Sequence, residues 1–254
     1  MKIIRYHFDV IDSTNTWAKG HVDEFDSSAL ILVTATAQTG GRGRFKRKWH
    51  SPSGVNIYAT FCFFVEFSCL DRVGVGHIPQ LLALSTVSCL EYLHFQPKVK
   101  WPNDVLLSGK KVAGILCETT SGQDERGRWV ICGIGCNVNM PQEELDLIDR
   151  PATSLLVETK EENSYDVESV LQLIQNAFRA NLNRFLDTGF APFFQDYQQH
   201  SCFKEEQAIR FHDNQHIVEG FFYSLNPDGS LTLRVKENGG NQENLKIYYA
   251  GEFL

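Results

Sequence analysis

Apolar and polar positions divide the chain into a long region of mixed strands and helices and a shorter tail of strands alone. Nearly continuous apolar, β-branched runs predict buried strands, because a strand covered on both faces needs no polar alternation. These runs cover residues 3–11, 29–37, 55–65, 111–118 and 129–137. Glycines interrupt the last two of them, which indicates strand faces that a ligand or another side chain approaches closely.

Helical spacing and capping residues predict four helices among these strands. Asp12 or Ser13 caps a short helix. Pro79 opens a longer one that ends near residue 94, and Asp166 caps a long amphipathic helix that ends at Gly189. An aromatic-rich helix follows it. Such an order of elements indicates an α+β protein.

The pattern changes after about residue 202, where short strands and turn signals replace helical spacing. We expect strands over residues 208–211, 217–225, 230–235 and 245–249, with a turn at 226–229. A tail of this kind predicts a small β-barrel. The expected organisation is therefore a larger domain over residues 1–202 and a small domain over residues 203–254.

The stretch from Gln38 to Trp49, QTGGRGRFKRKW, connects two of the predicted strands. Its three glycines allow close approach to backbone N–H groups, and its five cations suit an anion such as a nucleotide phosphate. Two other interpretations compete with this one, a solvated basic turn and a patch that binds nucleic acid.

Composition favours the small anionic ligand. The chain has 254 residues, 43% of them hydrophobic, and a net charge of −7. A general binder of nucleic acid or anionic membranes carries a basic excess, so the cationic loop is a local feature. Seven cysteines without a CxxC pair, no apolar signal segment and no membrane-length apolar run indicate a reduced, cytoplasmic protein.

Several common sites are excluded by spacing. Gly109-Lys110 is followed by lysine and lacks the first glycine of a P-loop, and no dinucleotide fingerprint or GxSxG elbow is present. His212 and His216 lie in a polar turn and predict no metal site. The strongest remaining candidate is Lys111, which begins a glycine-bearing strand and can neutralise a carboxylate and a phosphoryl group together.

Four motifs in sequence order carry a family resemblance. DSTN, GRGRFKRKW with HSPSGVNIY, KWPNDVLLSGKKVAGILCE and GIGCNVN together resemble the biotin–protein ligases over about residues 6–140. The resemblance implies the α+β fold of class II aminoacyl-tRNA synthetases and biotin ligases, a mixed sheet flanked by helices followed by an SH3-like β-barrel. It also implies ATP-dependent formation of biotinyl-5′-AMP and transfer of biotin to a lysine of a carrier protein.

The resemblance assigns residues to three roles. Catalysis falls to Lys111, Arg42 and Asp104. Biotin binding falls to Ser13, Thr14, Asn15, Gln38, Gly41, Arg42, Gly43, Arg44, Lys111, Gly114 and Gly133. ATP binding falls to Arg42, Arg44, Arg47, Trp49, Asn103, Lys111 and Asn137. We expect Mg²⁺ to arrive with ATP, with no dedicated protein site. We also expect residues 41–48 to be mobile until ligand binds.

Partners follow from the same resemblance. A biotin carrier domain with an acceptor lysine is expected, and a membrane is not. Some family members begin with a DNA-binding winged helix; this chain starts almost at the first catalytic strand, so we expect no nucleic-acid binding. The sequence leaves the oligomeric state open, including a homodimer. Two alternatives remain: a lipoate–protein ligase, disfavoured by the GRGRxxRxW form, and a biotin sensor without catalysis, disfavoured by Lys111 and Arg42.

Overall fold

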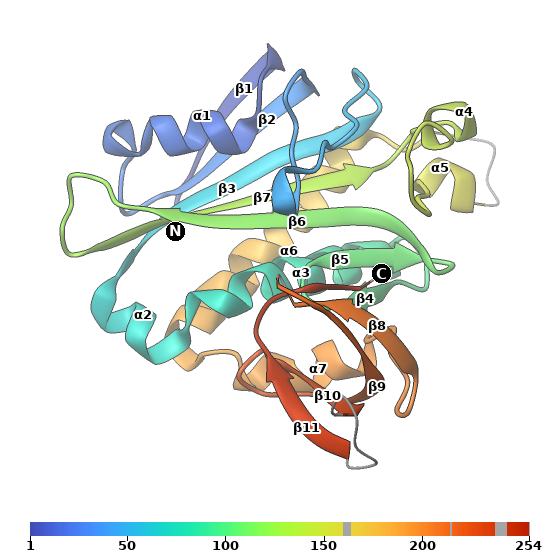
Figure 1. Cartoon of the computed structure of the whole chain (residues 1–254). Coiled ribbons are helices and arrows are strands. Elements are labelled where there is room, and N and C mark those ends of the chain that lie inside the picture. Colours follow the sequence, from blue (N-terminus) through green and yellow to red (C-terminus); the bar gives the residue numbers. More distant parts are fainter. Residues whose placement is uncertain (160–163, 214, 237–242, 254) are drawn as a thin grey trace.

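A computed structural model describes residues 1–159, 164–213, 215–236 and 243–253. Within them, a seven-stranded mixed sheet lies beside a smaller five-stranded antiparallel sheet (Figure 1). The large sheet has the order β1-β2-β3-β7-β6-β5-β4, in which β1 and β2 are parallel and the other pairs antiparallel. Its strands are β1 (Ile3–Ile11), β2 (Leu30–Gln38), β3 (Asn56–Glu66), β4 (Lys98–Lys100), β5 (Asp104–Leu107), β6 (Lys110–Thr120) and β7 (Gly127–Asn137).

Helices cover both faces of the large sheet unequally. The helices are α1 (Thr14–Gly20), α2 (Phe67–Val73), α3 (Ile78–Tyr92), α4 (Gln142–Leu145), α5 (Leu155–Glu158), α6 (Val167–Thr188) and α7 (Ala191–Gln199). The main core lies between the sheet and the pair α3 and α6, and a smaller core lies under α1 on the opposite face. The part of this opposite face that α1 leaves open carries the candidate site.

Capping explains where the site-bearing and core helices begin and end. The side chain of Ser13 accepts a hydrogen bond from the backbone of Thr16 and caps α1, and Asp166 caps α6 through the backbone of Ser169. Gly189 ends α6 with a positive φ of 70°, which a glycine adopts without strain. These caps confirm the predicted helix limits.

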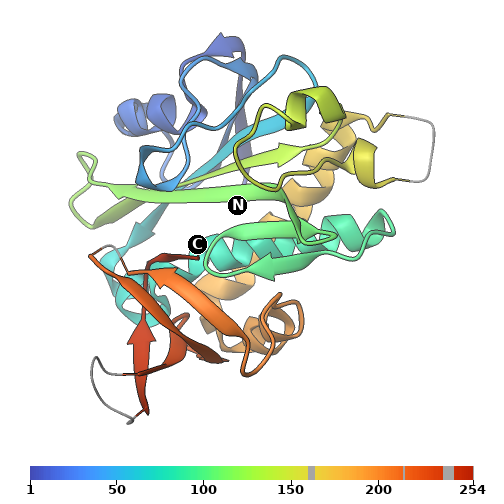
Figure 2. The same cartoon turned by 45° about the vertical axis from the view of Figure 1, so that its right-hand side comes forward.

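The C-terminal sheet has the order β11-β10-β9-β8-β12. Its strands are β8 (Ala208–His212), β9 (Ile217–Leu225), β10 (Leu231–Lys236), β11 (Glu243–Tyr248) and β12 (Glu252–Phe253). Figures 1 and 2 show this sheet beside the β4–β5 end of the large sheet, with the C-terminus close to β5. The backbone N–H of Val99 donates to the carbonyl of His200, and that of Cys202 to the carbonyl of Val99, so the chain enters the sheet directly from β4.

The predicted strands and helices are present with small shifts of their limits. Sequence patterns missed the short helices α2, α4 and α5 and the two-residue strand β12. None of them has a pattern of its own to detect: α4 and α5 are four residues long, and β12 is too short for periodicity and exists because it pairs with β8. Three short 3₁₀ turns, Val22–Glu24, Arg44–Lys46 and Val75–His77, were also not predicted.

Candidate active site

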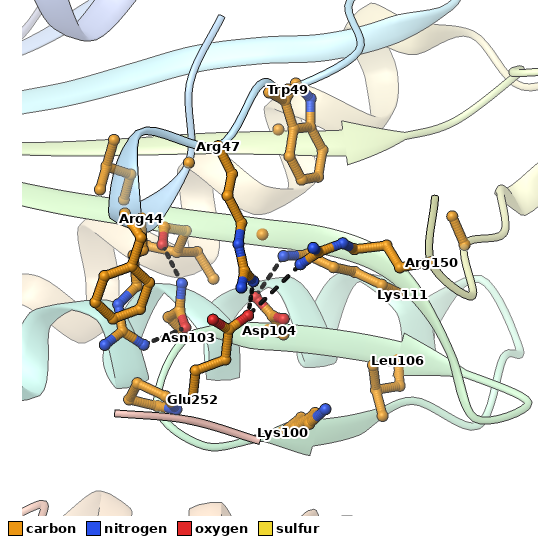
Figure 3. Close-up of a pocket in the computed structure, with 18 of the residues that line it drawn as sticks. Arg44, Arg47, Trp49, Lys100, Asn103, Asp104, Leu106, Lys111, Arg150 and Glu252 are labelled. Atoms are coloured by element: carbon orange, nitrogen blue, oxygen red, sulfur yellow. Dashed lines mark hydrogen bonds and ion pairs between the residues drawn. The ribbon is translucent and has the colours of Figure 1, made fainter. Parts of the chain in front are cut away.

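A cavity of about 1310 Å³ opens between the large sheet, the Gln38–Trp49 loop and the C-terminal sheet (Figure 3). All the predicted site residues line this cavity except Gly41. The structure thus brings together residues from β2, the loop, β5, β6 and β7 that lie up to about a hundred positions apart in the chain. A cavity of this size is ample for a small ligand together with a nucleotide.

One end of the cavity is a buried polar cluster. Ser13, Thr14 and Asn15 at the start of α1 are each less than 5% exposed. The backbone N–H of Thr14 donates to Gln38 Oε1 at 2.9 Å, and the hydroxyl of Thr60 lies 2.7 Å from Asn15 Oδ1. Buried polar groups held in this way are pre-oriented for hydrogen bonding to a polar ring. Thr60 was not predicted, because nothing in its apolar strand distinguishes it.

Glycines of β6 and β7 form part of the cavity floor, where neighbouring side chains pack directly against their backbone. A Cβ atom on Gly133 would lie 2.1 Å from Asn15 Oδ1, and one on Gly135 would lie 2.3 Å from the Trp49 ring. At Gly114 it would meet both Lys111 and Trp49 within 2.9 Å. The space beside these glycines therefore admits protein side chains, and their expected role in leaving room for a ligand stays a prediction.

The Gln38–Trp49 loop forms a short hairpin over the sheet. The backbone N–H of Trp49 donates to the carbonyl of Gly41 at 2.9 Å, and the backbone N–H of Gly43 donates to the carbonyl of Arg47 at 2.8 Å. At the tip, Phe45 and Lys46 have positive φ values of 55° and 58°. Non-glycine residues rarely adopt this conformation, and when they do it is at sites that the surroundings constrain.

The arginines of the loop separate to different parts of the cavity. Arg42 donates to the carboxylate of Glu118 on β6 at 2.9 Å, beside the polar cluster. Arg44 donates to Asn103 Oδ1 at 3.2 Å, and Arg47 pairs with Glu252 of β12. Burial lowers the pKa of Arg44, and a guanidinium group keeps its charge in proteins.

Glu118 is a site residue that sequence reasoning missed. Its carboxylate also lies 3.3 Å from Asn15 Nδ2 and 3.5 Å from Lys19 Nζ. Burial opposes its ionisation, but the hydrogen bond and charge of Arg42, with Asn15 and Lys19, outweigh it and lower the pKa of Glu118. Its position four residues after Gly114, on the same strand face, was the available signal.

Lys111 lies at the centre of the cavity (Figure 3). Its Nζ is 2.7 Å from Asp104 Oδ1 and 5.3 Å from the centre of the Trp49 ring. In a regular strand Lys111 and Gly114 would face opposite sides, but a bulge in the β5–β6 pairing places both on the cavity face. The bulge therefore aims the amine into the site.

Three buried polar atoms of the cavity wall have no hydrogen-bond partner among the described residues: Trp49 Nε1, Asp104 Oδ1 and Asn137 Oδ1. Asp104 Oδ1 faces the amine of Lys111 at 2.7 Å, which leaves one donor, Trp49 Nε1, and one acceptor, Asn137 Oδ1. The amide nitrogen of Asn137 is already used, since it donates to the carbonyl of Thr153 at 3.0 Å. Buried polar groups are normally satisfied, so this donor and acceptor are suited to a ligand that offers the complementary groups.

Arg150 and Glu252 complete the wall and were not predicted. Arg150 lies 3.5 Å from Glu252, which also pairs with Arg47. Figure 3 shows Arg47, Arg150 and Lys111 turned toward one space next to Asp104. Neither Arg150 nor Glu252 belongs to a motif, and only the folded chain brings them to the cavity.

Membrane-spanning helices, clusters of metal-ligating side chains and disulfides are all absent from the described residues. No helix in the described part of the chain has both the length and the apolar character to cross a membrane. The described ranges contain no group of three or more metal-ligating side chains and no disulfide.

Comparisons with known proteins agree with this geometry. The profile of the biotin/lipoate A/B protein ligase family matches residues 7–137. The bifunctional ligase/repressor BirA of Bacillus subtilis is 34% identical over 252 residues, covering 96% of this chain and 72% of its own. The biotin–[acetyl-CoA-carboxylase] ligase of Paracoccus denitrificans is 30% identical over 224 residues, covering 88% and 91%.

Solved structures give the same answer for the fold. The biotin protein ligase of Aquifex aeolicus in complex with biotin and ATP superposes with a TM-score of 0.77 and 27% identity. That alignment covers 100% of this chain and 97% of the other. The α+β architecture predicted from the sequence is thereby confirmed. This chain belongs to the biotin/lipoate A/B protein ligase family.

Proposed function

We propose that this chain is a biotin–protein ligase, which activates biotin with ATP to biotinyl-5′-AMP and transfers it to a lysine of a carrier protein. Relatives that cover nearly all of the chain are named as biotin ligases, and a similar structure holds biotin and ATP. Among the structural observations, one carries the proposal: a single cavity joins a buried polar cluster to a cationic region that contains Lys111.

Biotin is assigned to the polar end. Ser13, Thr14 and Asn15, with Gln38 behind them, offer donors and acceptors to the ureido ring. The backbone of Gly41 and Gly43, with Gly114 and Gly133 in the floor, is assigned to the same ligand. Arg42 is held by Glu118 at this end, and we propose that it fixes the loop over biotin. Direct contact of Arg42 with the carboxylate or with ATP stays a prediction.

ATP is assigned to the other end. Trp49 Nε1 and Asn137 Oδ1 are the unpartnered donor and acceptor there. Asn103 accepts a hydrogen bond from Arg44. Arg44 and Arg47 supply positive charge for the phosphates. Guanidinium groups match phosphate oxygens with paired hydrogen bonds, so these arginines hold the triphosphate in one orientation.

The first step joins two anions. A carboxylate oxygen of biotin attacks the α-phosphorus of ATP, the bond to the bridging oxygen breaks, and pyrophosphate leaves. Lys111 lies between the two assigned regions, where its ammonium offsets the repulsion of the reacting groups. Charge that develops on the phosphoryl oxygens in the transition state strengthens this interaction.

The second step uses the same centre. The deprotonated amine of the acceptor lysine attacks the carbonyl carbon of the mixed anhydride, an amide forms and AMP leaves. Asp104 is the carboxylate nearest to this centre, and we assign it to the incoming amine or to the metal-bound phosphates. Mg²⁺ prefers oxygen ligands and retains waters, so we propose that it enters with ATP without a dedicated protein site, and Asp104 is the carboxylate that would lie near it.

The larger organisation belongs to the same proposal. Residues 1–202 form the catalytic unit and residues 203–254 the small C-terminal unit. A biotin carrier domain is the macromolecular substrate. The oligomeric state stays open, with a homodimer included, and the absence of nucleic-acid binding stays a prediction.

Pyrophosphate release tests the function directly. Purified protein with ATP and Mg²⁺ is expected to release pyrophosphate with biotin and not with lipoate. Lys111→Ala is expected to lower the rate about a hundred-fold or more. The matched control is Lys110→Ala, because Lys110 is exposed next to Lys111 and its loss is expected to leave the rate unchanged.

Other outcomes distinguish the alternatives. Pyrophosphate release with lipoate but not with biotin would identify a lipoate–protein ligase. Biotin binding without pyrophosphate release would identify a sensor. Equal rates for the wild type and Lys111→Ala would remove Lys111 from the mechanism.

A further inference from the structure

A turn of the C-terminal sheet is inserted into the catalytic part of the chain. Asn226–Gly229 connects β9 to β10 and is held by its own hydrogen bonds, including Asn226 N–H to the carbonyl of Ser230 at 2.9 Å. Gly229 has φ +81°, and a Cβ there would lie 2.9 Å from the His77 ring. Glycine is therefore required both by the backbone conformation and by the contact.

One carbonyl oxygen at this turn accepts two hydrogen bonds from the catalytic part. Trp101 Nε1 donates to Gly229 O at 2.8 Å and Gln80 Nε2 donates to the same atom at 3.0 Å. Both side chains are only 2% exposed. Because a buried donor without an acceptor is costly, the carbonyl fixes the position of each side chain relative to the turn.

The two donors lead to different places. Gln80 lies in α3 and touches the core, whereas Trp101 begins the bend that carries Asn103 and Asp104. Two residues further on, Asn103 exchanges hydrogen bonds with the backbone of Ile115 and accepts from Arg44. Asp104 pairs with Lys111. Trp101 is thus connected to Arg44 and Lys111 through Asn103 and Asp104, whereas the described hydrogen bonds of the Gln80 side chain go to His77 and Gly229.

We infer that Trp101 is a positioning residue, through which the Asn226–Gly229 turn of the C-terminal sheet sets the geometry of the nucleotide end of the site. This inference rests on the proposed assignment of that end to ATP. It gives the C-terminal sheet a specific part in nucleotide binding, exerted through the Gly229 carbonyl and the indole N–H.

Two variants each remove one donor to the Gly229 carbonyl. They distinguish a role of Trp101 in positioning the nucleotide end from a contact that only holds the C-terminal sheet in place. Trp101→Phe keeps an aromatic ring and loses the N–H, and Gln80→Met keeps the length and loses the amide. Trp101→Phe is expected to weaken binding of a non-hydrolysable ATP analogue about tenfold, the size of one hydrogen bond, with biotin affinity unchanged. Gln80→Met is expected to leave both affinities unchanged, although both variants lower the unfolding temperature.

A third variant acts from the other side of the contact. Gly229→Ala displaces the carbonyl without changing any residue that lines the cavity, and it is expected to weaken the analogue as Trp101→Phe does. If Trp101→Phe proves too unstable to study, this variant decides the question at a temperature where it is folded.

The outcomes are distinct. Equal loss of analogue affinity in Trp101→Phe and Gln80→Met, no loss in Trp101→Phe or Gly229→Ala, or a wild type that does not bind the analogue, would overturn the inference. A wild type that binds the analogue but releases no pyrophosphate with biotin would refute the proposed function alone, and the titrations would still decide the role of Trp101.

Discussion

Arg42 and Glu118 form a hydrogen-bonded ion pair of 2.9 Å across 76 positions of the chain. The pair fastens the base of the Gln38–Trp49 loop to β6, directly beside Asn15. Arg44 and Arg47 are then free to extend from the loop toward Asn103 and Glu252. The three arginines of this loop therefore divide into one that anchors its base and two that face the proposed nucleotide end.

Replacing Glu118 by glutamine is predicted to loosen this anchor and weaken biotin binding. The ion pair is partly exposed, so its contribution is near the lower end for charged hydrogen bonds, and the loss in affinity is expected to be about fivefold. Titration calorimetry with biotin measures it. Glu125→Gln, at an exposed position of the β6–β7 turn, is the control. Unchanged affinity in Glu118→Gln would contradict the anchoring role.

The same carboxylate predicts a pH dependence. The pKa of Glu118 in the folded protein is lowered from its ordinary value of 4.5, so folding favours its ionised form. Its contribution to stability is present above pH 4.5 and is lost as the pH falls through the lowered folded-state pKa. The difference in unfolding free energy between the wild type and Glu118→Gln is thus expected to be constant near neutrality and to shrink in acid. A difference that grows on acidification would reverse the assignment.

Gly135→Ala is predicted to damage the nucleotide end selectively. The added methyl group would lie 2.3 Å from the Trp49 ring, so the ring must shift from its place beside Lys111. Overpacking of this kind costs about 1–3 kcal/mol, so we expect a lower unfolding temperature and an increase in KM for ATP. Gly20→Ala, where a Cβ meets nothing within 4 Å, is the control. Steady-state kinetics with ATP varied at saturating biotin would show no change if Trp49 is not a nucleotide contact.

Much of the fold was predictable because the strands of the large sheet are long apolar runs and the helices carry their own caps. Ser13, Asp166 and Gly189 act locally, so the sequence around each is sufficient to identify it. The short elements α2 and β12 escaped detection because β12 owes its existence to a distant strand and α2 has too few turns for a clear periodicity.

The candidate site was predictable only in part, for a related reason. Motif residues such as Asn15, Lys111 and Asn137 line one cavity as expected. Glu118 and Glu252 were missed because their importance depends on cations 76 and 205 positions away. The orientation of the Lys111 side chain depends on a bulge between β5 and β6, which no residue type in that stretch indicates.

The loop over residues 41–48 is predicted to open readily without ligand, although its arginine side chains contact Glu118, Asn103 and Glu252. Phe45 and Lys46 keep a left-handed backbone conformation that costs about 1–3 kcal/mol each, and the loop carries five cations close together. Its anchors are partly exposed and contribute little individually. Trypsin is therefore expected to cleave after Arg44 or Lys46 in the free protein and much more slowly with biotin and ATP, because the anions neutralise the loop. Mass spectrometry of the fragments measures the two rates, and biotin alone or ATP alone shows which ligand closes the loop. Equal cleavage with and without both ligands would show that the loop does not close over them.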